Sequence, residues 1–314
     1  MSAAPVLRWL IGAALAACLV LIAIGFGGRL HPAFDSFAHF RAHLSAAGFV
    51  LALLFFGSGA RGPGAVGAIA AVAALLTVAS AYVAPERAPA PGGGETFKLL
   101  HLNLRFDNPT PEAVFELVTR TRPDVLALNE VSAEWRERLP RLLEVYPFHI
   151  VCEARHRIGG VAILSRRPWA SAAGEPRCLE RGSFAMATLD FGGTKIDISA
   201  LHLGWPWPYE QAWNVGQVRP ELAKLGNPAI LVGDFNATPW SATAASVRQA
   251  GGLAAISGLG TTWLHHSLPR ALLPLGLPID QAMLKGGIVV HEARTLEPVG
   301  SDHLPVLLAF SLPR

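Results

Sequence analysis

Residues 231–239 read Leu-Val-Gly-Asp-Phe-Asn-Ala-Thr-Pro. The apolar residues 229–232 predict a buried strand, and Gly233, Asp234 and Asn236 follow where that strand ends. A buried strand has little use for a carboxylate, whereas a carboxylate just beyond it can point into a cleft shared with neighbouring strands. Taken alone, the stretch is also compatible with a simple tight turn, because Gly, Asp and Asn all favour turns.

The same arrangement recurs through the C-terminal two thirds of the chain, where polar side chains follow the ends of apolar runs. These positions are Asn103, Glu130, His202, Asp234 with Asn236, Asp280, and Asp302 with His303. Each has an ordinary structural explanation: Asn103 as a satisfied core amide, for example, or His202 as a structural histidine. Their joint order along the chain favours one shared site.

Many short apolar runs with few helical segments between them predict two packed sheets flanked by helices. Strands are expected at residues 97–104, 125–128, 148–151, 160–164, 184–189, 196–203, 229–232, 279–284 and 304–310. Helices are expected at residues 110–122, 133–143, 209–225 and 241–250, the second disturbed by Pro140.

Two further stretches are as distinctive as residues 231–239. Residues 123–131 read Pro-Asp-Val-Leu-Ala-Leu-Asn-Glu-Val, and residues 300–306 read Gly-Ser-Asp-His-Leu-Pro-Val. With these three stretches, residues 96–311 resemble the endonuclease/exonuclease/phosphatase superfamily, which includes DNase I-like nucleases, apurinic endonucleases, neutral sphingomyelinases and inositol-polyphosphate 5-phosphatases. The resemblance implies a four-layered α/β sandwich, with its site at one end of two stacked sheets, and divalent-metal-dependent hydrolysis of a phosphoester.

By this resemblance, Glu130 is the principal metal ligand, supported by Asn103 and Asp302. A hard cation such as Mg²⁺, with Mn²⁺ as the alternative, prefers carboxylate, carbonyl and water oxygens. It would neutralise a phosphate oxygen and the charge that develops on the leaving group.

The resemblance also implies the catalytic roles. Asp234 would position and deprotonate the attacking water, and Asn236 would hold the phosphate or that water. His303, oriented by Asp280, would act as an imidazolium that donates to the phosphoryl oxygen, because a carboxylate partner raises the pKa of a histidine. His202 would be a second donor. The expected reaction is in-line hydrolysis without a covalent enzyme intermediate.

Two positions depart from the family pattern. The family usually has Gln before the metal-binding Glu, whereas this chain has Asn129. It often has His after the late Ile-Asp pair, whereas this chain has Gln281 after Ile279-Asp280. Neither departure removes a core catalytic group, and both leave the substrate open.

Aromatic residues in the loops beyond the strands are candidates for substrate binding, chiefly Trp205 and Trp240. They would stack on bases, lie at a membrane interface, or simply pack the loops. Residues 268–278 are unusually apolar for the rim of a cleft. Nucleic acid, a lipid and a small phosphoester therefore remain candidate substrates, and no protein partner is implied.

The chain is 51% hydrophobic and 16% charged, and the excess of apolar residues lies near the N-terminus. Residues 9–28, 44–60 and 62–84 are each long enough to cross a bilayer as a helix. We expect residues 1–84 to form a three-helix membrane anchor, residues 85–94 a Pro/Gly linker, and residues 95–314 the catalytic domain. A cleaved signal peptide would explain only the first run.

Residues 1–90 contain five Arg and two acidic residues, which leaves 21 Lys and Arg against 21 Asp and Glu for the remainder. The neutral remainder argues mildly against a dedicated nucleic-acid binder. Arg8 predicts a cytoplasmic N-terminus, and hence a multi-pass protein of the bacterial inner membrane with a periplasmic domain. Arg29 and Arg41 favour the alternative, a cytoplasmic domain. A Cys152–Cys178 disulfide would support the periplasm, although two free thiols are equally compatible with the spacing.

Two other classes of function compete with hydrolysis. The first is a catalytically silent, membrane-tethered binding domain, which is disfavoured because all the expected polar groups are present. The second is a transporter or sensor, which is disfavoured because the three apolar runs contain no carboxylate or Lys.

Overall fold

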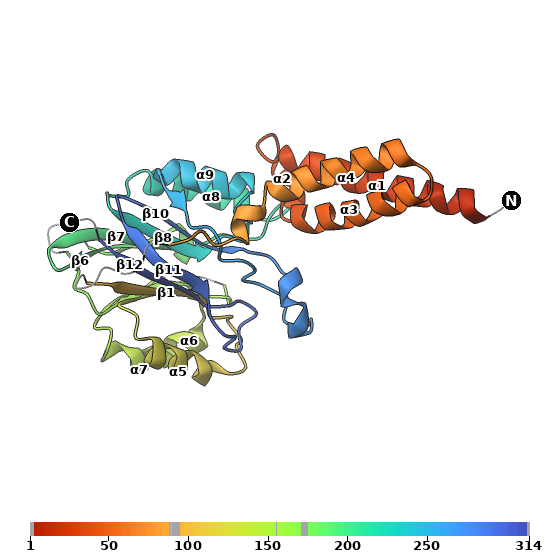
Figure 1. Ribbon diagram of the computed structural model, residues 1–314. Helices are drawn as coiled ribbons and strands as arrows, with labels where there is room; N and C mark the ends of the chain where they lie inside the picture. Colours follow the sequence, from red (N-terminus) through yellow and green to blue (C-terminus); the bar gives the residue numbers. More distant parts are fainter. Residues whose placement is uncertain (1–2, 88, 90–94, 155, 171–174, 313–314) are drawn as a thin grey trace.

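The computed structural model describes residues 3–87, 89, 95–154, 156–170 and 175–312. Two six-stranded mixed sheets are stacked between two layers of helices, and a group of N-terminal helices projects from one side of this sandwich (Figure 1). The predicted four-layered α/β sandwich is confirmed.

The first sheet has the strand order β11-β12-β1-β2-β4-β3. Its strands are β1 (Phe97–Asn103), β2 (Val125–Val131), β3 (Phe148–Val151), β4 (Gly160–Ser165), β11 (Val289–Thr295) and β12 (Val306–Ser311). β1 and β2 run parallel, with Asn103 opposite Asn129. Both are nearly continuous apolar runs because both faces of this sheet are covered.

The second sheet has the order β5-β6-β7-β8-β10-β9. Its strands are β5 (Arg177–Leu179), β6 (Phe184–Phe191), β7 (Thr194–His202), β8 (Ala229–Asp234), β9 (Ala254–Ala255) and β10 (Asp280–Lys285). β7 and β8 run parallel with His202 opposite Asp234, while β10 is antiparallel to β8 with Asp280 opposite Asp234. Register thus brings three predicted site residues to one edge.

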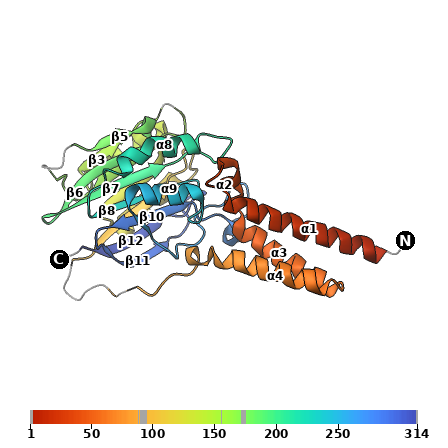
Figure 2. The ribbon, with the colours of Figure 1, turned by 90° about the horizontal axis from the view of Figure 1, so that it is seen from above.

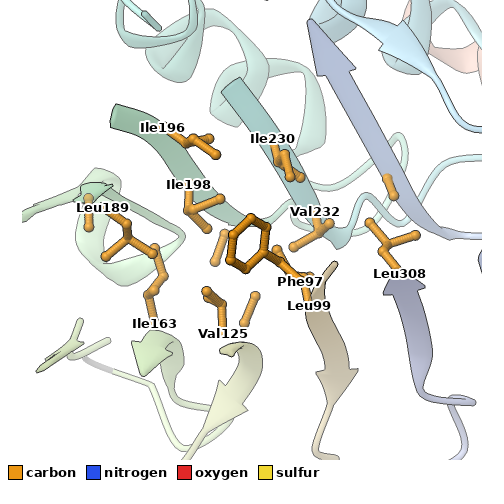
Figure 3. Close-up of a cluster of buried hydrophobic side chains, with 14 of the residues drawn as sticks. Phe97, Leu99, Val125, Ile163, Leu189, Ile196, Ile198, Ile230, Val232 and Leu308 are labelled. Carbon is orange, nitrogen blue, oxygen red and sulfur yellow. The ribbon is translucent and has the colours of Figure 1, made fainter. Parts of the chain in front are cut away.

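The central core lies between the two sheets. Phe97, Leu99 and Val125 from the first sheet meet Ile198 and Ile230 from the second (Figure 3). These side chains are almost completely buried, so water is excluded from this central part of the space between the sheets.

The outer layers are two groups of helices. The first sheet is covered by α5 (Pro111–Thr121), α6 (Ala133–Arg138) and α7 (Pro140–Leu143). The second is covered by α8 (Gln211–Leu222) and α9 (Ala242–Gly251). The helix expected at residues 133–143 is divided at Leu139 because Pro140 has no N–H to continue the first segment.

Sequence patterns predicted the short edge strand β3 but missed β5, β9 and β11. β5 has three residues and β9 has two, which is too short for a periodic pattern. β11 is an edge strand with a bulge between Val290 and Glu292, which interrupts its alternation. The structure also contains the Cys152–Cys178 disulfide, which the sequence left open; it joins the loop after β3 to β5 in the other sheet.

The N-terminal helices are α1 (Ala3–Phe26), α2 (Pro32–Ala38), α3 (Arg41–Gly57) and α4 (Arg61–Leu76), followed by the single turn η1 (Ala79–Ala81). Helix α1 is long and apolar enough to cross a membrane. Helices α2 and α3 pass the same test only as a pair bent by 60°, and α4 is shorter. Within the predicted linker, residues 88 and 90–94 lie outside the described residues.

Side chains in this helical group are distributed in the opposite way to those of the sandwich. Large apolar residues such as Leu53, Leu54 and Ile69 are exposed, whereas the small residues Gly67 and Ala71 are buried. A Cβ at Gly67 would lie 2.8 Å from the Leu15 side chain, so close helix contact requires the glycine. Figure 2 shows α1, α3 and α4 side by side, extending away from the sheets.

Candidate active site

One end of the sandwich collects polar side chains from both sheets. Asn103 ends β1, His202 ends β7, Asp234 ends β8 and Asp280 begins β10, while Glu130 lies one residue before the end of β2. Parallel strands within each sheet bring their carboxyl ends to the same edge, and antiparallel β10 contributes its first residue there.

Asn103 links the carboxylates of the two sheets. Its Nδ2 donates to Glu130 Oε1 and to Asp234 Oδ2, each at 3.0 Å. The second oxygen of Glu130 accepts from the Phe106 amide at 2.8 Å. Glu130 has φ +57°, a left-handed conformation that is unfavourable for a glutamate and that is most often maintained at functional sites.

A second group is built around Asp280. Its Oδ2 accepts from His303 Nδ1 at 2.7 Å, and its Oδ1 lies 3.0 Å from His101 Nε2. The other ring nitrogen of His101 is 3.1 Å from the Ala127 carbonyl oxygen. The His101 ring therefore joins Asp280 to the backbone of β2.

The two groups meet at Asp234. His303 Nε2 and His202 Nε2 each lie 3.7 Å from Asp234 Oδ2. Asp234 Oδ1 accepts from the Asn236 amide at 2.8 Å, which holds the turn after β8 closed. A Cβ at Gly233 would lie 1.8 Å from the Leu201 carbonyl oxygen, so only glycine lets β8 approach β7 this closely.

Residues 301–303 are held against β1. Ser301 Oγ donates to the Asn103 carbonyl oxygen at 2.8 Å and accepts from the His303 amide at 3.1 Å. Asp302 Oδ2 accepts from Trp263 Nε1 at 3.1 Å. Ser301 therefore fixes the backbone of the two residues that follow it, Asp302 and His303.

Charges in this group depend strongly on one another. Burial alone would lower the pKa of His303, but the carboxylates of Asp280 and Asp234 raise it to about 10, so the ring is an imidazolium. Burial would raise the pKa of Asp280, but the positive charge of His303 and the hydrogen bonds from His101 and His303 lower it.

Burial has the larger effect on the neighbouring groups. It raises the pKa of Asp234 to about 7, with the His303 charge opposing and the Asp280 charge adding to the rise. It raises the pKa of Glu130 against the opposing effect of His303. It lowers the pKa of His202 to about 3, assisted by the positive charge of His303, so His202 is neutral.

These side chains face a cavity of about 760 Å³. Its lining includes Glu130, His202, Asp234, Asn236, Asp302 and His303. Asn103 and Asp280 lie behind them and are almost completely buried. Trp205 is half exposed at the rim, with its ring 6.0 Å from that of Trp263. A cavity of this size with a few convergent polar groups is typical of a small-ligand site.

The sequence matches a known family, and the fold matches that of solved structures. The family model described as "Endonuclease/Exonuclease/phosphatase family" matches residues 100–303. The chain belongs to the endonuclease/exonuclease/phosphatase family. No curated protein matches it.

Solved structures share the fold at low sequence identity. D. rerio TDP2 complexed with a single-stranded DNA product has a TM-score of 0.56 and 16% identity, covering 69% of this chain and 99% of that one. An endonuclease/exonuclease/phosphatase from Bacteroides vulgatus has a TM-score of 0.56 and 15% identity, covering 70% and 100%. A double mutant of Staphylococcus aureus beta toxin with bound magnesium ions has a TM-score of 0.52 and 13% identity, covering 70% of this chain and 100% of that one.

Members of the endonuclease/exonuclease/phosphatase family are hydrolases of phosphoesters, and the residues present here fit a divalent cation. Glu130, Asp234 and Asp302 offer carboxylate oxygens to one cavity. Among the described residues, no Lys or Arg forms an ion pair with any of the three. Carboxylates that converge without a Lys or Arg partner suit Mg²⁺ or Mn²⁺.

A second donor set overlaps the first. Asp234, Asp280 and His303 have ligand atoms within 4.8 Å of one another. Asp280 and His303 are already hydrogen-bonded to each other, however, and Asp280 also contacts His101. The set around Glu130 consists of oxygen donors, which Mg²⁺ prefers, whereas the second set includes an imidazole.

One predicted substrate-binding residue lies elsewhere. Trp240 is not part of the cavity lining; its indole Nε1 donates to the Ala38 carbonyl oxygen at 2.6 Å, and its ring is 6.0 Å from that of Tyr82. The loop after Asn236 turns away from the cavity toward the N-terminal helices. The sequence could not show this, because the contact joins residues about 200 positions apart.

Sequence reasoning missed two residues that organise the site. His101 contacts Asp280, and Gln211 Nε2 donates to the Asn236 carbonyl oxygen at 2.8 Å and to the Phe235 carbonyl oxygen at 3.2 Å. His101 lies two positions before Asn103 and therefore points to the same face of β1, a signal that strand periodicity offers. Gln211 carries no such signal, because it begins a helix.

The two departures from the family pattern have structural roles. Asn129 Nδ2 donates to the Leu201 carbonyl oxygen at 2.7 Å, which joins the two sheets. Gln281 Nε2 donates to the Ala237 carbonyl oxygen at 2.5 Å, which supports the turn after β8. Both side chains are buried and neither lines the cavity.

Proposed function

We propose that residues 95–314 form a divalent-metal-dependent phosphoester hydrolase that uses a water activated by Asp234. The observation that carries this proposal is the Asn103 bridge between Glu130 and Asp234, opposite the Asp280–His303 pair, at one cavity. This arrangement supports a cation-binding carboxylate, a base and a positively charged donor around the space of one phosphate.

Each residue has a distinct role in this mechanism. Asp234 orients a water molecule and accepts its proton as the water oxygen bonds to phosphorus and the ester P–O bond breaks. The leaving oxygen takes its proton from solvent. His303 and His202 donate hydrogen bonds to the phosphoryl oxygens, and Asn236 holds the phosphate or the water.

Glu130, with Asn103 and Asp302, would hold the cation. When bound, the cation supplies charge neutralisation to the phosphate oxygens. Asp280 keeps His303 charged and fixes its ring through the 2.7 Å hydrogen bond. Trp205 remains a proposed contact for the rest of the substrate because it is exposed at the cavity rim.

The test is hydrolysis of bis-p-nitrophenyl phosphate by the full-length protein in detergent, with Mg²⁺ or with EDTA. Asp234→Ala and His303→Ala should each lower kcat by at least about a hundredfold, the range for a positioned acid or base. Val145→Ala, on the exposed surface after α7, is the control. Activity that persists in EDTA, or in both variants, excludes the mechanism. Absence of activity on every phosphoester favours a binding domain.

We also propose that residues 1–84 form a three-helix membrane anchor. The exposure of large apolar side chains and the burial of small ones support this arrangement. Arg41, which the charge count assigned to a loop, is buried, with its Nη2 donating to the Gly25 carbonyl oxygen at 3.3 Å. With Arg41 left out of the count, Arg8 and Arg61 on one side of the membrane outnumber Arg29 on the other. This balance, together with the Cys152–Cys178 disulfide, favours a periplasmic domain in a bacterial inner membrane.

Topology can be measured independently of activity. An alkaline-phosphatase fusion at the C-terminus should be active and a green-fluorescent-protein fusion dark if the domain is periplasmic. The reverse pattern establishes the cytoplasmic alternative.

A further inference from the structure

The loops that leave the site also contact the N-terminal helices. After His202 ends β7, the Trp207 carbonyl oxygen accepts from Ser36 Oγ at 3.3 Å. The Trp207 ring also lies 6.3 Å from the His31 ring. One wall of the cavity therefore leads directly to α2.

The segments beside two other strand ends also contact the N-terminal helices. After Asp234 ends β8, Trp240 contacts Ala38 and Tyr82. Before Asp280 begins β10, the Leu275 carbonyl oxygen lies 2.7 Å from His43 Nε2. Three strand ends that carry site residues thus reach the N-terminal helices within six positions along the chain.

Polar contacts fix the orientation of the helices on the domain. Asp35 is buried, and its two oxygens accept from the Ala242 and Thr243 amides at 2.7 and 2.9 Å. The Gly258 amide donates to the Ser80 carbonyl oxygen at 3.0 Å. Figures 1 and 2 agree that the helices extend away from the sandwich. The contacts beside His202, Asp234 and Asp280 therefore put the site near their base.

The base of the helices is surrounded by exposed apolar residues. On the domain these are Trp207, Tyr209, Leu272 and Leu275, the last two in the short 3₁₀ helix η3 (Arg270–Leu275). On and beside α2 they are Leu30, Phe34, Phe37 and Phe40. Exposed apolar patches that contain Trp and Tyr and lie beside a proposed membrane anchor are typical of the lipid–water interface.

The charge of the domain disfavours nucleic acid as the occupant. The domain is neutral, and Arg181 is the single Lys or Arg among the described residues that line the cavity. A nucleic-acid groove needs several cations to replace the counterions of the phosphates. A lipid headgroup needs the phosphate site and an apolar rim.

We propose that the cavity receives the phosphoester headgroup of a membrane lipid, presented by the leaflet in which the helices end. The apolar rim, defined as Trp207, Tyr209, Leu272 and Leu275, lies in the interfacial layer and brings the cavity to the headgroups. This inference rests on the proposed hydrolase activity and assigns its substrate class.

The activity test uses the full-length protein reconstituted in vesicles of phosphatidylcholine, phosphatidylglycerol and phosphatidic acid with Mg²⁺. Phosphorus NMR detects headgroup cleavage, while bis-p-nitrophenyl phosphate and a single-stranded oligonucleotide are assayed in parallel. The rim variant Leu272→Glu/Leu275→Glu changes two side chains that do not line the cavity. Val145→Glu changes a similarly exposed apolar residue that follows α7, in the helical layer on the first sheet.

We expect vesicle lipid to be cleaved and the rim variant to lower that rate by about tenfold or more. The rate on bis-p-nitrophenyl phosphate should stay within about twofold, because the cavity is unchanged. Val145→Glu should alter neither rate. Cleavage of bis-p-nitrophenyl phosphate without cleavage of any lipid overturns the lipid assignment and leaves the hydrolase proposal intact. Preferred cleavage of the oligonucleotide also overturns it. Failure on all substrates overturns both proposals.

A second measurement does not depend on catalysis. In a Cys18→Ser background, a nitrobenzoxadiazole label on Leu272→Cys should be quenched by lipids with brominated acyl chains. The same label on Val145→Cys should not be quenched. A label at position 272 that behaves like the one at position 145 overturns the interfacial position of the rim.

Discussion

At the scale of single residues, the site depends on side chains that face acceptors or donors in both directions. Asn103 holds two carboxylates with one amide nitrogen, and Asp280 lies between two imidazole rings. In a buried setting, each such link has a larger effect than on the surface, because no water can replace a lost partner.

His101 is expected to act as a positioning residue through Asp280. His101→Leu removes one of the two donors to that carboxylate, which should loosen His303 and lower kcat by about tenfold with little change in KM. His101→Gln retains a donor at a similar reach and should restore most of the activity. Equal loss in both variants, or a loss confined to thermal stability, would contradict a positioning role.

Tyr146 provides a test of stability at alkaline pH. Its hydroxyl donates to the Pro123 carbonyl oxygen at 3.0 Å, and burial raises its pKa to about 12. Between pH 10, where the unfolded residue titrates, and pH 12, the folded state retains a proton that the unfolded state has lost. The free energy of unfolding should therefore fall as pH rises, by up to about 1.4 kcal/mol per pH unit.

Tyr146→Phe is the matched variant. It should cost about 1 kcal/mol at neutral pH, because the Pro123 oxygen loses its donor, and should reduce the slope above pH 10. Urea denaturation of both proteins at several pH values measures this difference. Identical slopes would show that the phenol is not protected in the folded state.

At the scale of elements, strand register assembles what the sequence disperses. His202, Asp234 and Asp280 are neighbours across β7, β8 and β10 because these strands pair in a fixed register. A shift of one residue would turn each side chain to the other face of the sheet. Gly233 maintains this register, since any larger residue would meet the Leu201 carbonyl oxygen.

Helix α9 should depend on a residue from the N-terminal helices. Asp35 accepts hydrogen bonds from the Ala242 and Thr243 amides in the first turn of α9. Asp35→Ala therefore leaves both donors without that partner. We expect hydrogen exchange at these two amides to accelerate by about tenfold, as for the loss of an N-cap. Asp35→Asn retains one acceptor oxygen and should show a smaller change.

Amides in α5, which lies on the opposite face of the sandwich, serve as the internal reference for this measurement. Unchanged exchange at Ala242 and Thr243 would mean that the helices and the domain are not held together by this contact.

At the scale of the whole molecule, the two sheets are joined covalently as well as by their core. Cys152 follows β3 in the first sheet, Cys178 lies in β5 of the second, and 26 positions separate them. A loop of this length corresponds to a stabilisation of about 3 kcal/mol through the unfolded state.

Cys152→Ser/Cys178→Ser should therefore lower the free energy of unfolding by about 3 kcal/mol, measured by chemical denaturation of the full-length protein in detergent. Cys18→Ser, which removes the free cysteine of α1, should change it little. Equal stability of the double variant and the parent would exclude the disulfide as a structural link.

The sequence by itself predicted the family and the main strands, and through the family a phosphoester hydrolase. Continuous apolar runs at β1, β2 and β8 are visible because both faces of these strands are buried, and the polar residues at their ends follow the family pattern. The strands β5, β9 and β11 were not predicted, because the first two are too short and the third is interrupted by a bulge.

Only the tertiary structure decided which residues meet. In the structure, His101 contacts Asp280, and Trp240 contacts Ala38 instead of lining the cavity as predicted. Cys152 is bonded to Cys178. It also set the site at the base of the N-terminal helices. These contacts join residues 26 to 202 positions apart, and neither periodicity nor local propensity carries information over such separations.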